Sequence, residues 1–257
     1  MNAGGADGPR VRTSAHPWGT WVLLDAPQVR NALDPATVAA LLAVFGTDGP
    51  GAVLLSARGP SFCAGGDLSV LSTAAAGGDL ADLLVTRAAA FADLVEAMVA
   101  CPRPVVAALD GPAVGGGVSL ALACDVRLAT PRARLVLGWA RWGLPPDGGA
   151  AALLAAAVGA ETAELLLADG AEIGTDSPLA QRVFSRVVTP EDVEPAAVAT
   201  VSALAASPTA RAEKAAAAAP VLAALRAGRE EELAAVERAA GEATVVAGLA
   251  NVYKMKQ

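Results

Sequence analysis

Two continuous apolar runs, each leading into a cluster of glycines, constrain the fold of this 257-residue chain more than any other feature. Residues 51–57 and 104–110 lack the polar alternation of a half-exposed strand, so each is typical of a strand buried on both faces of a sheet. Glycine turns follow at 64–66 and 115–117, and helix-type sequence comes after each. Because a sheet buried on both faces needs helices to cover it, the pattern predicts an α/β fold.

The rest of the chain divides into a short lead, a mixed core and a helical end. We expect a flexible lead over residues 1–10, a core of strands and helices over 11–194 and an alanine-rich helical region over 195–257. Asp34 and Pro35 suit the start of a helix that reaches Phe45. The further expected elements are a hairpin (12–15 and 20–25), a loop (72–78), a tight glycine turn (111–117), helices (80–100, 118–124, 148–158, 161–168) and strands (126–129, 134–137, 182–188).

Composition excludes several classes of protein. A formal charge of −7 argues against a nucleic-acid partner, which would require a basic face. Three scattered cysteines and a single histidine, His16, leave neither a disulfide framework nor a metal site to expect. No apolar run reaches the length of about 18 residues that a membrane-spanning helix needs, and the N-terminus has no signal-peptide pattern. We therefore expect a cytoplasmic protein without a membrane partner.

The two glycine turns are the candidate functional site. Glycine lets backbone N–H groups face a ligand, and two such donors aimed at one point form an oxyanion hole. Neither turn has the spacing of a dinucleotide-binding or Walker loop. Residues 117–121 partly match a nucleophile elbow, but the last glycine is absent and His16 is the only histidine that could act as a base. A serine hydrolase is therefore disfavoured.

Five motifs, in this order and spacing over residues 11–190, resemble the enoyl-CoA hydratase/isomerase (crotonase) superfamily. They are Arg-Asn-Ala-Leu (30–33), Phe-Cys-Ala-Gly-Gly-Asp-Leu (62–68), Arg-Pro-Val-Val-Ala-Ala running into Gly-Pro-Ala-Val-Gly-Gly-Gly (103–117), Leu-Ala-Cys-Asp (122–125) and Gly-Leu-Pro-Pro-Asp-Gly-Gly (143–149). The resemblance implies a spiral of β-β-α turns with a C-terminal helical trimerisation region. It also implies an assembly as a homotrimer or a dimer of trimers.

The same resemblance implies an acyl-CoA thioester substrate, with coenzyme A present only as part of that substrate. The amides of Gly66 and Gly116 would hold the thioester oxygen. The implied substrate-binding residues are Arg30 near the CoA phosphates, Ala32 and Ala64 near the adenine, and Leu68, Ser119 and Trp139. Tyr253, Lys254 and Lys256 are candidates for a contact from a neighbouring subunit to the nucleotide; equally, they could form a solvated tail.

Asp147 is the acidic residue best placed for chemistry. In the hydratases of this family two glutamates act on water; Ser119 and Trp139 stand at those places here, which puts ordinary hydration in doubt. An aspartate at position 147 resembles family isomerases, and one carboxylate suffices to take a proton from one carbon and return it to another. Asp147 could instead only cap the helix that follows.

Three alternatives to an isomerase stay open at this point. Trp139 followed by Asp147 eight residues on resembles the 4-chlorobenzoyl-CoA dehalogenases, although Ala92 stands where those enzymes have a histidine. A hydratase that binds water at Ser119 is the second. A non-catalytic acyl-CoA-binding accessory protein that kept the fold is the third.

Overall fold

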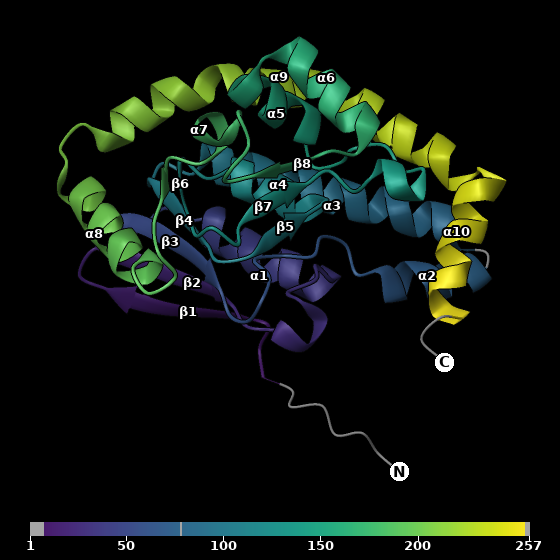
Figure 1. The fold of residues 1–257 in the computed structure, drawn as a ribbon, viewed down its shortest axis with the longest axis horizontal. Coiled ribbons are helices and arrows are strands. Elements are labelled where there is room, and N and C mark those ends of the chain that lie inside the picture. Colours follow the sequence, from purple (N-terminus) through teal and green to yellow (C-terminus); the bar gives the residue numbers. More distant parts are fainter. Residues whose placement is uncertain (1–7, 78, 255–257) are drawn as a thin grey trace.

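A computed structural model describes residues 8–77 and 79–254, and it confirms the α/β class (Figure 1). The strands are β1 Val11–His16, β2 Gly19–Leu24, β3 Ala52–Ala57, β4 Val105–Leu109, β5 Pro112–Val114, β6 Val126–Ala129, β7 Arg134–Val136, β8 Glu172–Gly174 and β9 Arg186–Val187. The α-helices are α1 Pro35–Phe45, α2 Leu68–Gly77, α3 Leu80–Ala100, α4 Gly116–Leu122, α5 Ala150–Val158, α6 Ala160–Asp169, α7 Ala180–Val183, α8 Val193–Ala206, α9 Ala210–Ala240 and α10 Ala243–Lys254. Two 3-10 turns, η1 Pro27–Val29 and η2 Ala140–Trp142, complete the order.

Two sheets organise the core. The larger has the order β1-β2-β3-β4-β6-β9, with an antiparallel β1/β2 hairpin and parallel pairing from β2 onward. The smaller has the order β5-β7-β8. The chain passes from β4 directly into β5, so the second glycine turn lies where the chain has moved from one sheet to the other.

The prediction of strands buried on both faces is confirmed by β3 and β4. In β3, Val53 and Leu55 face the main core, whereas Leu54 faces a second apolar cluster. In β4, Val105 and Val106 divide in the same way. These two strands carry the chain to the glycine turns, so the turns start from the most deeply buried part of the sheet.

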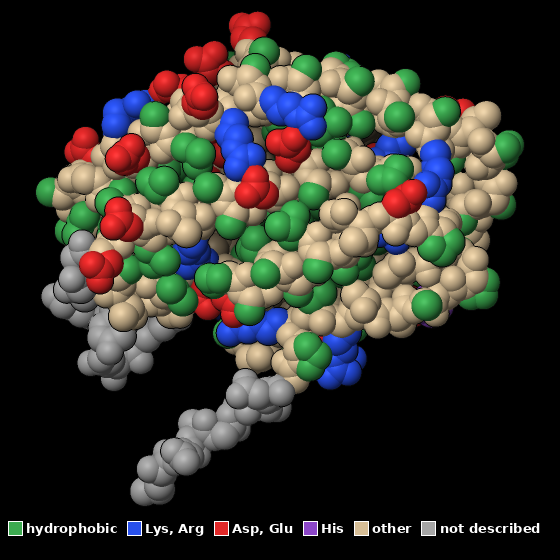
Figure 2. Space-filling model, turned by 180° about the vertical axis from the view of Figure 1, so that it is seen from behind, with side chains coloured by type: hydrophobic (Ala, Val, Ile, Leu, Met, Phe, Trp, Pro, Cys, Tyr) green, Lys and Arg blue, Asp and Glu red, His purple; other side chains and the backbone are tan. Residues whose placement is uncertain are grey.

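Helices cover both faces of the large sheet. The main core lies between that sheet and the helices α1, α3, α4 and α5, while α8 packs on the other face. The long helix α9 runs from α8 to α10 and packs along α3 (Figure 1). A third apolar cluster joins α2, α3, α9 and α10 beside the site. On the face shown in Figure 2, acidic and basic side chains are scattered among hydrophobic ones.

The structure corrects three expectations. Residues 72–78 were expected to form a loop, but α2 extends to Gly77, because Leu71 is buried in the cluster that α2 shares with α3 and α10. The strand expected over 182–188 is the end of α7 followed by the two-residue β9. The turn expected over 111–117 contains β5, and the sequence pattern missed β8.

The outer parts of the chain are described only in part. Residues 1–7 of the expected lead lie outside the described residues. The helical region contains α8, α9 and α10, and α8 begins at Val193. None of the helices in the described ranges is long and apolar enough to cross a membrane.

Candidate functional site

The two glycine turns lie side by side because the segments leading into them pair with each other. Cys63 and Ala113 form a parallel bridge, and the Val114 amide donates to the Cys63 carbonyl at 2.9 Å. Gly65 and Gly117 permit the close approach. A Cβ on Gly65, whose φ is +77°, would lie 2.5 Å from the Val114 oxygen, and one on Gly117 would lie 2.3 Å from the Cys63 oxygen. Main-chain pairing alone therefore sets the spacing of the turns.

Gly66 and Gly116, the predicted oxyanion-hole residues, both line one cavity. Within residues 8–77 and 79–254, neither amide donates a hydrogen bond, whereas the neighbouring amides of Gly65, Asp67 and Gly115 do. Two unused donors on the wall of a shared cavity are what an oxyanion hole requires.

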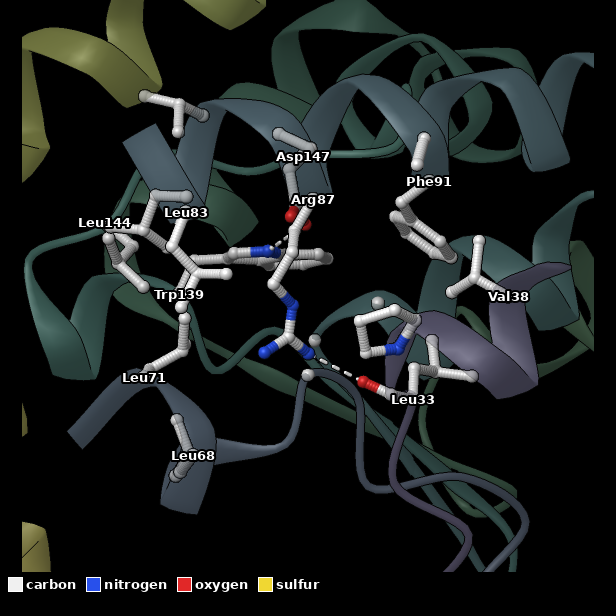
Figure 3. A pocket seen from close by; sticks show the side chains of 18 of the residues that line it. Leu33, Val38, Leu68, Leu71, Leu83, Arg87, Phe91, Trp139, Leu144 and Asp147 are labelled. Atoms are coloured by element: carbon white, nitrogen blue, oxygen red, sulfur yellow. Dashed lines mark hydrogen bonds between the residues drawn. The ribbon is translucent and has the colours of Figure 1, made fainter. Parts of the chain in front are cut away.

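The cavity has a volume of about 350 Å³ and walls that are mostly hydrophobic (Figure 3). The first glycine turn, α1, α2, α3, the segment 138–147 and α9 all contribute to the wall. The large apolar residues are Leu33, Val38, Leu42, Leu68, Leu71, Leu83, Leu84, Phe91, Val114, Trp139, Trp142, Leu144 and Val236. Among the described residues that line it, the only charged ones are Asp147 and Arg87.

Asp147 faces this cavity and is held by hydrogen bonds at its carboxylate and at its backbone oxygen. Trp139 donates from Nε1 to the Asp147 Oδ1 at 2.8 Å (Figure 3). Ser119 donates from Oγ to the Asp147 backbone oxygen at 3.1 Å. Burial raises the pKa of Asp147, while the Trp139 hydrogen bond and the Arg87 charge oppose that rise. A carboxylate whose pKa is raised inside an apolar cavity is suited to exchange a proton with a bound ligand.

Arg87 reaches the cavity from α3 and lies at the first glycine turn. Figure 3 shows its side chain extending past Trp139 toward Leu33, whose carbonyl accepts from Arg87 Nη2 at 2.6 Å. That nitrogen would lie 3.9 Å from a Cβ built on Gly66. Burial lowers the pKa of Arg87, and the charges of Asp67, Asp147 and Asp34 oppose that change, so the guanidinium stays charged.

Glu232 of α9 supports the turn that carries Asp147. Its Oε2 accepts from the Gly149 amide at 2.9 Å. Burial raises the pKa of Glu232 to about 7, and the Gly149 hydrogen bond opposes the rise while the charge of Asp147 adds to it. Gly148 and Gly149 fit here because they lack a side chain: their φ values are +61° and +66°. The helical region thus contributes a second carboxyl group behind the first.

The other predicted substrate-binding residues are placed differently with respect to the cavity. Ala64 and Leu68 line it together with Trp139, whereas Ala32 is buried outside it and Arg30 is exposed on the surface. Ser119 is fully buried and does not reach the cavity. Lys256 lies outside the described residues, and the side chains of Tyr253 and Lys254 do as well.

The neighbouring Asn31 has a structural role in the motif that contains Arg30. Its side chain accepts from the Ala26 amide at 2.8 Å and donates to the carbonyls of Arg58 and Ser61, at 3.0 and 2.9 Å. The asparagine therefore fixes the loop that pairs with the first glycine turn.

Neither histidine nor cysteine supplies a reactive group to the site. His16 ends β1 and stacks on Trp18 with ring centroids 4.7 Å apart, away from the residues that line the cavity. Cys63 is buried, and burial raises its pKa to about 12, so it is not a thiolate nucleophile at neutral pH. No cluster of potential metal ligands occurs in the described part of the chain.

The sequence motifs do not point to Arg87 or Glu232, although each residue interrupts a helical pattern of apolar residues and could have been found in that way. Arg87 lies three residues after Leu84 and four before Phe91, so it interrupts the apolar face of α3. Glu232 lies seven residues after Leu225 and four before Val236, which places it on the inward face of α9 in the same way. A charge on the buried face of a helix marks either an ion pair or a site.

The chain is similar to known proteins over nearly its whole length. The family model described as enoyl-CoA hydratase/isomerase matches residues 20–255. A crystal structure of an enoyl-CoA hydratase from Mycobacterium avium subsp. paratuberculosis K-10 superposes with a TM-score of 0.83 at 27% identity, covering 95% of this chain and 99% of that one.

Two curated relatives have different named activities. A probable enoyl-CoA hydratase of Mycobacterium bovis, echA6, is 33% identical over 174 residues, which is 66% of this chain and 68% of that protein. A 4-chlorobenzoyl coenzyme A dehalogenase of an Arthrobacter species is 30% identical over 173 residues, which is 67% of this chain and 62% of that protein.

Proposed function

The chain belongs to the enoyl-CoA hydratase/isomerase family, and we propose that within this family it is an enoyl-CoA isomerase that moves a double bond by proton transfer through Asp147. The observation that carries the proposal is the placement of one carboxylate, Asp147, in the same cavity as the unused amides of Gly66 and Gly116. The acyl group of a CoA thioester occupies the cavity, with its carbonyl oxygen at the two amides.

The reaction needs only these groups. Asp147 takes a proton from the carbon next to the thioester, the C–H electron pair forms a carbon–carbon double bond, and the carbonyl π pair moves onto oxygen. The amides of Gly66 and Gly116 stabilise the resulting enolate; losing one such donor costs enzymes about 10²–10³ in rate. Protonated Asp147 then returns the proton two carbons further along the chain, and the double bond shifts.

The residues at the expected positions of the two hydratase glutamates support an isomerase over a hydratase. Ser119 is fully buried and donates to the backbone of Asp147, so it has no surface on which to position a water molecule. Trp139 donates to the carboxylate of Asp147 and contributes no acid of its own. One carboxylate in an apolar cavity favours proton transfer between two carbons over addition of water.

The CoA moiety follows the loop that contains Arg30 and Ala32. Ala64 and Leu68 line the cavity beside this loop, and the exposed guanidinium of Arg30 is free to reach the phosphates. We expect the active assembly to be a homotrimer or a dimer of trimers, which light scattering of the purified protein measures directly.

Asp147→Asn tests the proposal. We expect the variant to lose deuterium exchange at the α- and γ-carbons of a 3-enoyl-CoA in D₂O, while it still binds the thioester in calorimetry. The matched control is Asp82→Asn, which removes an exposed carboxylate from the first turn of α3. Exchange by Asp147→Asn at the wild-type rate refutes the assignment. If the wild-type protein binds 3-enoyl-CoA, dienoyl-CoA and aryl-CoA thioesters but turns none of them over, it is an accessory binding protein instead.

The Trp139–Asp147 hydrogen bond favours one second candidate, an aryl-CoA dehalogenase. In that reaction Asp147 attacks the halogen-bearing ring carbon and chloride leaves, which forms an aryl ester that water then cleaves. The relative from Arthrobacter supports this candidate. Ala92, which stands where those enzymes have a histidine, argues against it, because it lines only a small separate cavity behind Gly148 and Gly149. Chloride release from 4-chlorobenzoyl-CoA, with no conversion of 3-enoyl-CoA, is the result that selects this candidate.

A further inference from the structure

We propose that Arg87 balances the negative charge of the reaction as that charge moves from Asp147 to the thioester oxygen. The inference rests on the proposed function, because it concerns the same proton transfer. Arg87 is the only cation among the described residues that line the cavity, and Asp147 is the only anion. Together they leave the cavity electrically neutral before the reaction begins.

The guanidinium is fixed at the end of the cavity where the enolate oxygen would form. Nη2 of Arg87 donates to the Leu33 carbonyl at 2.6 Å, and Leu33 pairs with Gly66 in a parallel bridge. The same nitrogen lies 3.9 Å from the position of a Cβ on Gly66. Since the Gly66 amide is one of the two unused donors, the cation lies beside the proposed oxyanion hole.

The charge of Arg87 also acts on the other end of the proton transfer. It lowers the pKa of Asp147 against the larger effect of burial, which favours the carboxylate, the form that acts as the base. When Asp147 takes the proton it becomes neutral, and the enolate oxygen becomes negative. The cation therefore faces one negative charge before the transfer and one after it, and the apolar cavity never holds an uncompensated anion.

A purely structural role predicts different behaviour. Arg87 also joins α3 to the loop at Leu33, so its removal could weaken the fold without affecting the chemistry. Arg87→Gln separates the two roles because the amide of glutamine can still donate to a carbonyl but has no charge. Arg87→Lys keeps the charge and loses the planar fork of donors.

The experiment measures α-carbon deuterium exchange of hexanoyl-CoA in D₂O, since a saturated thioester can form the enolate but cannot isomerise or add water. Because Arg87 also stabilises the Asp147 carboxylate before the transfer, only the difference between its interactions with the enolate oxygen and with the carboxylate changes the rate. For a cation that lies closer to the enolate oxygen, at an effective dielectric constant of about 20, we expect Arg87→Gln to slow exchange at saturation by about tenfold. We expect KM to stay within about threefold and Arg87→Lys to lose less than about threefold. Arg226→Met, which removes an exposed positive charge of α9, is the control with the same change in net charge.

Two further readouts depend on charge and not on packing. The acid limb of the exchange rate should move to higher pH in Arg87→Gln but not in Arg87→Lys, because loss of the cation raises the pKa of Asp147. Guanidinium chloride at low millimolar concentration should restore part of the exchange by Arg87→Ala.

Several results overturn the proposal. The first is exchange at the wild-type rate by a folded Arg87→Gln variant, and the second is an effect of that substitution on KM alone. The third is an equal loss of exchange rate in Arg87→Gln and Arg87→Lys, with the acid limb of neither variant moved. If Arg87→Gln does not fold, two other results decide the question. Arg87→Lys should keep the acid limb and most of the rate of the wild type, and guanidinium should restore part of the exchange by Arg87→Ala. If neither result is found, the proposal is refuted. The proposed function fails separately, if the wild-type protein itself shows no exchange that depends on Asp147.

Discussion

Replacing Trp139 with phenylalanine tests how the cavity sets the basicity of Asp147. The substitution keeps an aromatic ring but removes the indole N–H that donates to the carboxylate at 2.8 Å. A buried hydrogen bond to a charged group contributes about 1.5–3 kcal/mol, which corresponds to a rise of about 1–2 in the pKa of Asp147. Burial already raises that pKa, so the loss of Trp139 adds to a shift in the same direction.

The sign of the effect on the rate follows from the proposed role of Asp147 as a base. Only the carboxylate form accepts the proton, so the rate falls as the pH falls through the pKa of Asp147. With that pKa higher, the fall in Trp139→Phe begins about 1–2 pH units above that of the wild type. At a pH well above both values, the variant retains its base and exchanges deuterium at a rate similar to or above the wild type.

The assay is kcat/KM for α-carbon exchange or isomerisation, measured across the pH range in which the fold is intact. Trp142→Phe is the control, because Trp142 lines the same cavity but its indole makes no hydrogen bond among the described residues. Acid limbs that coincide in wild type and Trp139→Phe refute the reasoning. Equal movement in Trp142→Phe refutes it too, since the effect would then come from the loss of ring volume.

The remaining predictions concern the turn that follows Asp147 and its support from α9. Gly148→Ala is expected to lower the free energy of unfolding by about 1–3 kcal/mol, because its Cβ would lie 2.2 Å from Phe91 Cε1. Gly228→Ala, with open space around it in α9, is expected to raise that free energy by about 0.5–1 kcal/mol. Urea denaturation measures both, and equal effects contradict the packing argument. The raised pKa of Glu232 means that its carboxyl group stays protonated to higher pH in the folded state than in the unfolded chain. The stability contributed by this proton is therefore fully present below about pH 4.5 and is lost as the pH rises through about 7. After allowing for partial exposure, we expect Glu232→Gln to remove about 1–2 kcal/mol of this pH dependence between pH 5 and 8, and an unchanged dependence argues against it.

Much of the fold could be predicted from the sequence where one local signal dominates. Asp34 caps α1 through the Thr37 amide at 2.7 Å, as its position before Pro35 indicates. The buried strands β3 and β4 likewise follow from uninterrupted apolar runs. In these elements the local preference and the tertiary environment favour the same conformation.

The errors occur where distant contacts decide the conformation. The helix α2 has small residues and no charged ones, and its stability comes from packing Leu71 against α3 and α10. Residues 182–188 contain β-branched side chains, yet Val183 is buried at the end of α7. No local pattern predicts these outcomes, because the partners are far away in the sequence.

The candidate site could be predicted only in part for the same reason. Asp147 and the two glycine turns stand in motifs, so the sequence points to them directly. Arg87 and Glu232 stand in helices with no motif, and only the three-dimensional arrangement brings the first beside Gly66 and the second beneath Gly149. Residues that tune a site through charge are therefore harder to find in a sequence than residues that define its backbone geometry.

The pairing of the two glycine turns through main-chain atoms has a consequence for how such a protein can diversify. The donors at Gly66 and Gly116 depend on glycine and on backbone hydrogen bonds, whereas the leucines and aromatic residues around them only shape the space for the acyl group. Substitutions among those wall residues can therefore alter which acyl chains fit while the two amides proposed to bind the thioester oxygen stay in place. New specificities can arise one wall residue at a time, without passing through an ancestor that has lost its chemistry.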